Sequence, residues 1–423
     1  MIKNLLHFAF VLVYIPAAAN GESPDLSAGL NVSGLGDCVT VFAVDKTKLY
    51  TIAGRERFVG AAFQPSVVMD SGGFIHVFFQ ARLDGSGDRN EKLIAHVTSE
   101  DGGKTYSVLC FVNETPLQSY AVSAFTREAP SGGERISILT SVSIDETIAR
   151  LKDPKIIKER TGIDVSTFTR KAAALVLEFF SDDRGKTWKR KEHRGISDRT
   201  YERNGKYYYL AFMNLIGQVR RVKGGPHDGR LILGGPLRGG YLPCKDHPHF
   251  RDYPASSSII FSDDDGESWD FGGVIADDTA FAHNEASAVS INGGNRLLMV
   301  RRRYRENGEG KVIHYSNDGG MTWGAGHASS IAATRCLQVL ETHGDLILCS
   351  APGKRNRTRG TIYLSSDSGV SWTPKLIEKG PFSYSTVNRL SDDFFLCSYS
   401  RGHHGENGIG ARLFSSAWLF SKQ

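Results

Sequence analysis

The sequence has no strong excess of one charge and, after its first residues, no apolar run long enough to span a membrane. Its 423 residues include 51 Lys and Arg against 46 Asp and Glu, which gives a formal net charge of +5. An excess this small gives no indication of nucleic-acid binding. It is compatible with an anionic substrate, and an ordinary soluble surface would account for it equally well.

Cysteines are also few and are not spaced as metal ligands. The six cysteines include no C-x-x-C pair, so a zinc site is not predicted. An exported chain can form disulfides, but the sequence does not determine which cysteines would pair. Cys349 and Cys397 lie within apolar, strand-like runs, where buried free thiols are at least as compatible with the sequence as bridges.

The N-terminal residues have the pattern of a secretory signal peptide. Lys3 precedes an apolar run over residues 5–15, and residues 17–19 are all alanine, which suits cleavage. The run is short for a transmembrane helix, although an uncleaved anchor is the alternative. We therefore expect residues 1–20 to be removed and residues 25–423 to form one domain. The mature protein is expected to be secreted, periplasmic or extracellular, without stable membrane insertion.

One short motif is repeated along the sequence. The pattern S-x-D-x-G-x-[ST]-[WY] occurs five times, beginning at Ser99, Ser181, Ser262, Ser316 and Ser365, and four of the five Trp residues close a copy. Its Asp can accept backbone N–H bonds within a tight turn, and its Gly can adopt a φ that other residues resist. The aromatic residue can pack over the turn. Each copy therefore predicts a β-hairpin between two outer strands of a repeated sheet.

The segments between these motifs predict strands. Short runs rich in β-branched and aromatic residues recur, bounded by turn residues, over residues 74–79, 175–180, 206–212, 257–261, 297–300, 346–349 and 394–399. Recurrence without intervening helices favours an all-β protein, and the repeat selects a propeller. Residues 144–161 are the exception, because apolar residues there have roughly helical spacing. They predict an inserted loop with a short helix, for which a lid over a site is the less favoured alternative.

The repeated motif is the Asp box, or BNR repeat, and nearly the whole mature chain resembles the sialidase (neuraminidase) superfamily. The resemblance implies a six-bladed β-propeller carrying one short helical insertion. The boxes themselves are structural, since non-enzymatic proteins also carry them. Any indication of activity must therefore come from residues between the boxes.

Three residues resemble the family's catalytic positions. Tyr384, followed by Ser385, resembles the motif whose tyrosine is the nucleophile, and Glu285 resembles the glutamate that acts on it. Asp88 resembles the acid/base aspartate, with Asp84 as the alternative. Each also has a structural interpretation, as a packed strand tyrosine, a turn glutamate or an ordinary loop acid. Together they imply an exo-α-sialidase-like glycoside hydrolase with a retaining mechanism, which would act on sialylated or other acidic glycans.

Three arginines resemble the family's substrate-binding positions. Arg82, Arg301 and Arg357 would bind the acidic group of the sugar through charge-assisted, often bidentate, hydrogen bonds. Arg355 and Arg359 are rivals for the role of Arg357, and a solvated basic surface is the structural alternative for each arginine.

The chemistry explains why a tyrosine would serve as nucleophile. A sialic acid bears a carboxylate on its anomeric carbon, and a carboxylate nucleophile about 4 Å away would be repelled by about 4 kcal/mol at an effective dielectric constant near 20. Tyrosine is neutral until it attacks, and sialidases are an exception among glycosidases in using it. Its ordinary pKa, near 10, requires a neighbouring base. This mechanism requires no metal or other cofactor.

The sequence departs from the family at two positions. Sialidases begin with an Arg two residues before a Pro, but Phe63 stands in that place before Pro65. Ser400 stands where a Glu would orient that Arg. Because removing one partner of an ion pair leaves an uncompensated charge, the loss of both is a coherent change. Arg55 or Arg57 could reach in as a replacement.

Three functions are compatible with the altered site. The first is a working sialidase with a rearranged carboxylate clamp. The others are a glycosidase for a related sugar and a propeller that binds glycans without cleaving them. The third function would have no need of the pair formed by Tyr384 and Glu285.

Overall fold

The computed structural model describes residue 26 and residues 34–117, 120–161, 163–167, 174–197, 200–203, 206–213, 215–241, 255–275, 283–303 and 310–421. The predicted signal peptide lies outside the described residues, as does Cys244. The five described cysteines, at positions 38, 110, 336, 349 and 397, are free thiols. None of the described helices is long and apolar enough to cross a membrane.

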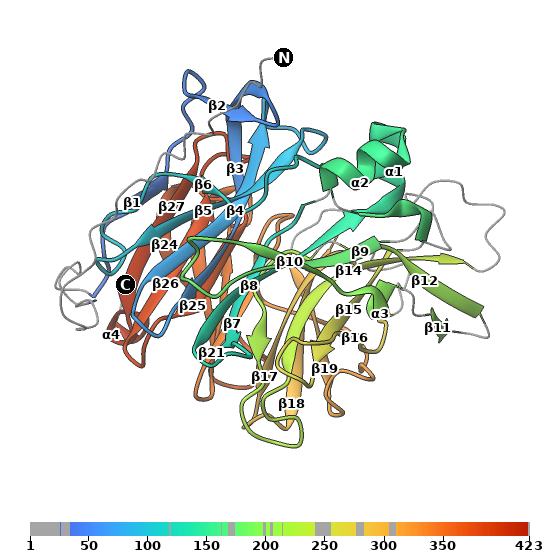
Figure 1. Ribbon diagram of the computed structural model, residues 1–423. Coiled ribbons are helices and arrows are strands. Elements are labelled where there is room, and N and C mark those ends of the chain that lie inside the picture. The colour runs from blue at the N-terminus through green and yellow to red at the C-terminus, as the bar shows by residue number, and fades with distance from the viewer. Residues whose placement is uncertain are drawn as a thin grey trace, which may run out of the picture.

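Six antiparallel sheets form the blades of a β-propeller, as the sequence predicts (Figure 1). The first three sheets consist of β2 (Leu49–Ile52), β3 (Arg55–Met69), β4 (Ile75–Leu83), β5 (Lys92–Ser99) and β6 (Cys110–Phe111); β7 (Ser123–Glu128), β8 (Glu134–Ser143), β9 (Ala174–Ser181) and β10 (Lys189–Glu192); and β11 (Thr200–Arg203), β12 (Lys206–Met213), β13 (Arg220–Arg221), β14 (Leu231–Tyr241), β15 (Ala255–Ser262) and β16 (Asp270–Phe271).

The last three sheets complete the ring. They consist of β17 (His283–Ile291), β18 (Arg296–Arg303), β19 (Lys311–Ser316) and β20 (His327–Ala328); β21 (Val339–His343), β22 (Leu346–Ala351), β23 (Thr358–Ser365) and β24 (Thr373–Pro381); and β25 (Ser385–Arg389), β26 (Phe394–Ser400), β27 (Ile409–Ser415) and β1 (Val39–Phe42). The N-terminal strand β1 thus pairs with β27 in the last blade. This pairing closes the ring with strands from both ends of the described chain, which leaves no gap between the first and last blades.

The five Asp boxes form the turns between the last two strands of their sheets. In the fifth box, Asp367 accepts the Ser371 backbone N–H at 2.9 Å and Ser365 Oγ accepts the Gly369 N–H at 2.8 Å. The same pair of contacts recurs in the other four boxes. Gly369 has φ +87°, and a Cβ there would meet Leu298 of the preceding blade at 2.3 Å. The boxes therefore shape their turns and also pack against the neighbouring blade.

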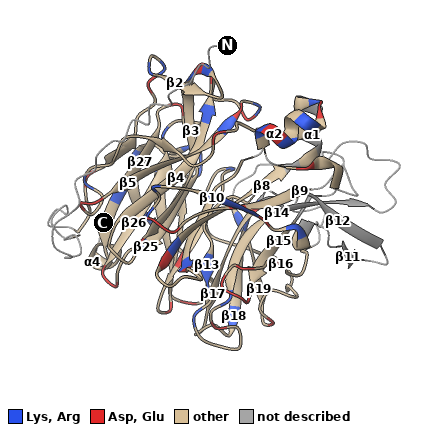
Figure 2. Cartoon of the chain, viewed as in Figure 1, with Lys and Arg blue, Asp and Glu red and all other residues tan. Residues whose placement is uncertain are grey.

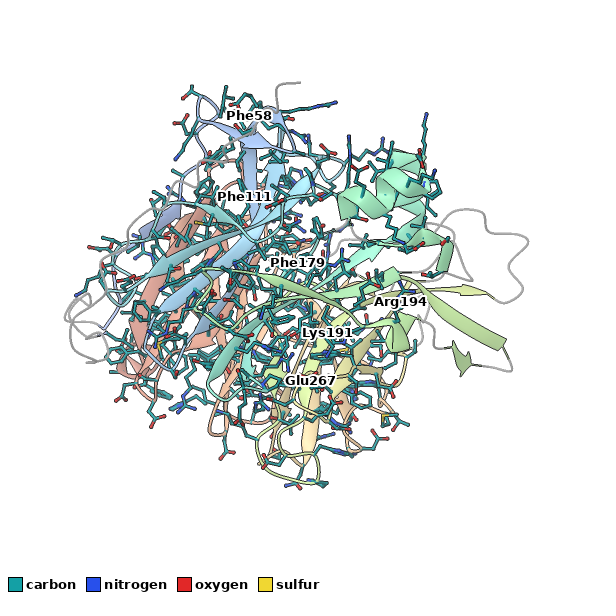
Figure 3. The ribbon with its side chains drawn as sticks, viewed as in Figure 1. Phe58, Phe111, Phe179, Lys191, Arg194 and Glu267 are labelled. Atoms are coloured by element: carbon teal, nitrogen blue, oxygen red, sulfur yellow. The ribbon has the colours of Figure 1, made fainter. Side chains whose placement is uncertain are left out.

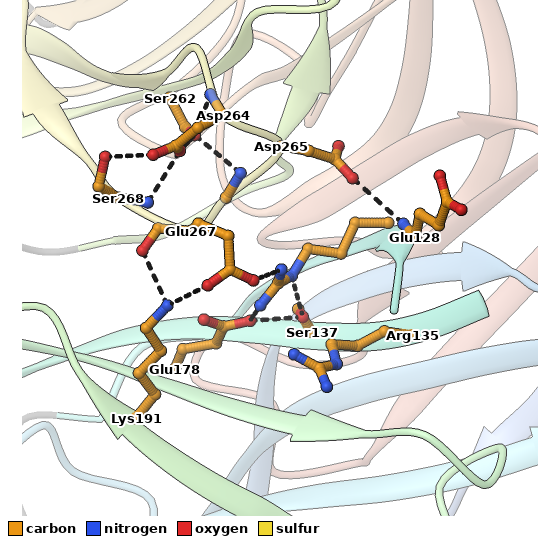
Figure 4. A network of polar contacts seen from close by, with 12 residues as sticks. Glu128, Arg135, Ser137, Glu178, Lys191, Ser262, Asp264, Asp265, Glu267 and Ser268 are labelled. Carbon is orange, nitrogen blue, oxygen red and sulfur yellow. Dashed lines mark hydrogen bonds and ion pairs between the residues drawn. The ribbon is translucent and has the colours of Figure 1, made fainter. Parts of the chain in front are cut away.

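An ionic cluster, buried except at Glu267, joins the second blade to the third. We call Arg127, Glu178, His193 and Glu267 the inter-blade cluster. Arg127 Nη2 lies 3.0 Å from Glu178 and its Nη1 binds Glu267, which follows Asp264 in the third Asp box (Figure 4). Lys191 Nζ also binds the Glu267 carboxylate, at 2.7 Å, and the two residues are labelled one above the other in Figure 3. The third box is thus tied to the second blade by charge as well as by packing.

Apolar cores lie between adjacent blades. Phe78 and Ile94 of the first blade pack with Ile138 and Leu177 of the second in one cluster. Basic and acidic residues are interspersed over the blades rather than gathered in one region (Figure 2), which is consistent with the small net charge.

The predicted insertion is helical and follows the second strand of the second blade. It contains two short helices rather than one, α1 (Ile144–Leu151) and α2 (Pro154–Thr161), which lie together at one end of that blade (Figure 1). Ile144 and Ile157 are buried in the core shared with the first blade. The insertion therefore covers apolar surface. Two further short helices are α3 (Arg194–Ser197) and α4 (Ser416–Phe420).

Candidate active site

Tyr384 and Glu285 meet at one end of the central strands, although 99 residues separate them. Tyr384 directly precedes β25, and Glu285 lies near the start of β17. The Tyr384 hydroxyl donates a hydrogen bond to Glu285 Oε1, and both residues are about 5% exposed. The structure thus brings together the two residues that the sequence assigned as nucleophile and base.

Arg302 completes this contact. Its Nη1 lies 2.5 Å from Glu285 Oε2 and 3.2 Å from the Tyr384 hydroxyl oxygen. Burial alone would lower the pKa of Arg302, but the Glu285 carboxylate and Tyr384 raise it. The guanidinium therefore stays charged beside the hydroxyl.

Burial and the Glu285 charge raise the pKa of Tyr384 well above its ordinary value, and the charges of Arg302 and Arg357 oppose this effect only in part. The phenol therefore keeps its proton at neutral pH. It can become a nucleophile only if an acceptor takes that proton, and Glu285 is within hydrogen-bond reach.

Arg301, the predicted binding residue, does not make these contacts with Glu285 and Tyr384. Its Nε donates to Ser257 Oγ at 3.0 Å, and its Nη1 lies 3.2 Å from His314 Nε2. Successive residues of a strand point to opposite faces, so Arg301 faces the third blade while Arg302 faces Tyr384. The structure therefore places Arg302, and not the predicted Arg301, beside Glu285 and Tyr384. A register shift between β17 and β18 lies next to this position.

Arg357 lies over the ring of Tyr384, as expected for a residue of this site. Its guanidinium carbon is 5.4 Å from the ring centroid, and its Nη1 donates to the backbone carbonyl of His403. The rivals Arg355 and Arg359 are exposed. The geometry therefore favours Arg357.

Phe63 occupies the wall of the site next to the tyrosine. Its ring centroid lies 4.5 Å from that of Tyr384. The backbone N–H of Gln64 donates to Ser400 Oγ at 3.1 Å, so the two positions that depart from the family lie side by side. Arg57 does not replace the missing guanidinium, because it binds Asp84 at 2.7 Å and also binds Glu91.

Arg82 and Asp88 approach the same wall from the first blade. The Arg82 guanidinium carbon lies 4.2 Å from the centroid of Phe63, and its Nη2 lies 2.8 Å from Asp88 Oδ1. Burial lowers the pKa of Arg82, and Asp88 partly offsets this effect. The Asp88 side chain is 79% exposed, so it can reach a substrate. Asp84 binds Arg57 instead, so Asp88 is the carboxylate that lies next to the guanidinium packed on Phe63, and the geometry favours Asp88 as the acid.

The comparisons with known proteins agree with this architecture. Residues 162–396, more than half of the chain, match the model of the BNR repeat-like domain. The chain belongs to the BNR repeat-like family. Its propeller is that of the sialidase superfamily.

Relatives and solved structures extend the likeness to most of the chain. A sialidase of Micromonospora viridifaciens is 26% identical over 387 residues, which cover 87% of this chain and 53% of the relative. The chain thus spans about half the length of that relative. A Trypanosoma rangeli sialidase in complex with 2,3-difluorosialic acid (covalent intermediate) has a TM-score of 0.61 at 17% identity, covering 90% of this chain and 59% of that one. The Hadza microbial sialidase Hz136 has a TM-score of 0.59 at 17% identity, covering 85% and 68%. These structures support the fold alone.

This BNR repeat-like propeller also has site residues that the sequence did not indicate. Lys311 is buried behind Arg302, and its Nζ donates to the carbonyl oxygens of Thr334 and Cys336 at 3.2 and 2.8 Å. Burial, reinforced by the charge of Arg302, lowers the pKa of Lys311 to about 8. No motif marks Lys311, since only the pairing of β18 with β19 sets it opposite Arg302.

A separate cavity of about 380 Å³ lies at the opposite end of the inner strands. Arg220, Glu341 and Arg389 are among its lining residues, and Arg389 ends the strand that Tyr384 precedes. Arg220 there is bound by Glu341 and by two backbone carbonyls. We place the candidate active site at Tyr384 because its acid, base and cations converge there.

Proposed function

We propose that this protein is an exported glycoside hydrolase of the exo-α-sialidase type, which releases terminal sialic acid from glycoconjugates with retention of configuration. The observation that carries the proposal is the buried contact of the Tyr384 hydroxyl with Glu285, beside Arg302. A phenol bonded to a carboxylate is the pair that a neutral nucleophile requires. The likeness to the Micromonospora viridifaciens sialidase supports the same substrate class.

In the first step, the Tyr384 oxygen attacks the anomeric carbon while its proton passes to Glu285. The bond to the leaving oxygen breaks, and Asp88 protonates that oxygen. The sugar is then held on Tyr384 as an aryl glycoside, through a bond between the anomeric carbon and the phenol oxygen. Because Tyr384 is neutral before attack, it does not repel the carboxylate on the same carbon.

In the second step, Asp88 removes a proton from water, and the water oxygen attacks the anomeric carbon from the face that the leaving group vacated. The bond to Tyr384 breaks, and the phenolate regains its proton from Glu285. Two inversions give net retention. Each residue ends in the protonation state in which it began.

Arg302 and Arg357 would hold the substrate carboxylate, since both guanidinium groups lie against Tyr384. Arg82 would instead orient Asp88, to which it is directly bound. Phe63 offers this carboxylate no hydrogen bond, so the clamp is expected to be weaker than one with a third arginine. A charged hydrogen bond is worth about 1.5–3 kcal/mol.

The test is turnover of a fluorogenic aryl α-sialoside beside a panel of other aryl glycosides. Tyr384→Phe should lower kcat by at least about a thousandfold, since it removes the nucleophile. Tyr315→Phe is the matched control, because the Tyr315 hydroxyl donates to the backbone carbonyl of Ser368 in the fifth Asp box. Glycan binding without turnover of any glycoside would refute the enzymatic proposal, and full activity of Tyr384→Phe would refute the nucleophile.

A further inference from the structure

The loop between β26 and β27 brings His404 to the edge of the Tyr384 site. Residues 401–408 fold back onto β3, where the Ala62 backbone N–H donates to the Gly405 carbonyl oxygen at 2.9 Å. Gly405 has φ +79°, and a Cβ at this position would meet the Ala62 oxygen at 1.9 Å. A glycine is therefore needed for the loop to lie this close to the strand that carries Phe63.

The orientation of the loop is held by hydrogen bonds at several points. The Glu406 carboxylate accepts the backbone N–H groups of His403 and His404 at 3.0 and 2.7 Å. The His403 carbonyl oxygen accepts from Arg357, and from Ser383 Oγ at 3.3 Å. His404 is thus attached to the same segment that positions the arginine over Tyr384.

The His404 side chain is half-buried, and its ring centroid lies 6.3 Å from that of Phe63. Its charged surroundings are Arg82, Asp88 and Arg357 from other elements and His403 and Glu406 from its own loop.

The imidazole of His404 is neutral near pH 7. Burial lowers the pKa of His404, as do Arg357 and Arg82, while Asp88 and Glu406 oppose the shift. Its Nδ1 is buried and has no hydrogen-bond partner within the described residues. Because Nδ1 is enclosed, any contact of this ring with a ligand would be made through Nε2.

We propose that His404 binds the substrate carboxylate on the side where Phe63 can form no hydrogen bond. The proposal rests on the function proposed above. A neutral imidazole donates one N–H, and here Nε2–H would bond one carboxylate oxygen while Arg302 and Arg357 hold the rest of the group. The ligand class is still a sugar acid, but it is held by two guanidinium groups and one neutral donor.

The first test compares His404→Phe with His404→Gln. Phe keeps an aromatic ring and removes the donor, so kcat/KM for an aryl α-sialoside should fall about ten- to a hundredfold, mainly through KM. Gln keeps an N–H at similar reach and should remain within about threefold of the wild type. His327→Phe on the outer strand β20 is the matched control and should leave kcat/KM unchanged. His404→Phe with the kinetics of the wild type, or His404→Gln as impaired as His404→Phe, would overturn the proposal.

The second test is the pH dependence of kcat/KM. If His404 had only a structural role, the wild type and His404→Gln would show the same pH dependence. As pH falls, His404 gains a charge and binds the carboxylate more strongly, so the ratio of kcat/KM between wild type and His404→Gln should rise. A ratio that stays constant with pH would contradict the assignment.

Binding measurements separate this proposal from the proposed function. In a Tyr384→Phe background, calorimetry would compare free sialic acid with its methyl ester. His404→Phe should weaken binding of the acid about tenfold or more and weaken that of the ester less, because an ester carbonyl is a poorer acceptor than a carboxylate. Absence of turnover in the wild type would refute the enzymatic function alone, and the acid–ester difference would still decide the role of His404. If the acid binds no better than the ester, the role of His404 is refuted.

Discussion

Two buried clusters of this propeller pair a glutamate with an arginine, and they differ in the partners that complete them. In the inter-blade cluster, Glu178 accepts hydrogen bonds from Arg127 at 3.0 Å and Ser137 at 2.6 Å (Figure 4), and it lies 3.0 Å from His193 Nε2. At the end of the inner strands, Glu285 binds Arg302 and accepts from Tyr384.

The difference separates a structural pair from a reactive one. Burial alone would raise the pKa of Glu178, but His193, Ser137 and Arg127 lower it, so this carboxylate stays ionised. Glu285 instead faces a phenol that burial keeps protonated. The same residue types therefore stabilise the fold in one place and can transfer a proton in the other, because the third partner differs.

The largest effect is expected for Glu285→Gln. Loss of the base should lower kcat by about a hundred- to ten-thousandfold, the range for general acid–base catalysis. Arg302 retains some contact with solvent, at 11% side-chain exposure, so the loss of stability should be smaller than for Glu178→Gln. Steady-state kinetics and thermal unfolding of the same preparation would check both. Retained kcat would remove the distinction between the clusters.

Glu178→Gln should lower the stability of the fold and leave kcat nearly unchanged. It removes one of the two carboxylates that bind Arg127, at a position where Arg127 and Glu178 are both nearly inaccessible. Breaking a buried pair costs up to about 3–5 kcal/mol, and the remaining contact with Glu267 offsets part of that loss. Denaturant unfolding should show this loss, while kcat of the folded protein stays within about twofold. A normal free energy of unfolding would show that the inter-blade pair contributes little.

Arg302→Lys and Arg301→Lys sharpen the comparison at neighbouring positions. Lysine cannot reproduce the guanidinium contacts with Glu285 and the substrate carboxylate, so Arg302→Lys should lower kcat/KM about ten- to a hundredfold. Arg301 faces Ser257 and His314 instead, and its variant should remain within about threefold. The reverse ranking would restore the original assignment from the sequence.

The smallest effect concerns acid stability at Glu267. Hydrogen bonds from Lys191 and Arg127 lower its pKa from 4.5 to about 2. Between these values the unfolded chain binds more protons, so the stabilisation is present above pH 4.5 and is lost as pH falls toward 2. Because the Glu267 side chain is 47% exposed, solvent screening limits this stabilisation to about 1 kcal/mol. The pH dependence of unfolding should be flatter for Glu267→Gln, and an unchanged slope would contradict this.

Features that depend on contacts between residues close together in the sequence were predictable. The strand runs and Asp boxes match the blades because their contacts lie within a few residues, as between Asp367 and Ser371. The insertion was predicted for the same reason, since helical spacing is local. The sequence does not predict its second helix, because Lys152 and Asp153 interrupt the helical spacing of the apolar residues.

The site was predictable only where the family resemblance supplied a position. Tyr384, Glu285, Arg82, Asp88 and Arg357 lie together as that resemblance implies. The sequence does not distinguish Arg301 from Arg302, because both are arginines in the same strand. Only the direction of each side chain decides which one faces Tyr384.

The sequence by itself determined the propeller, since a repeated turn motif and strand periodicity are local properties that each blade expresses independently. It also marked Phe63 and Ser400 as departures from the family. Only the tertiary structure decided that these two positions are adjacent, that Arg302 rather than Arg301 reaches the phenol, and that His404 borders the same wall. Those outcomes depend on side-chain direction and on the closure of the ring, which brings residues hundreds of positions apart within hydrogen-bond distance.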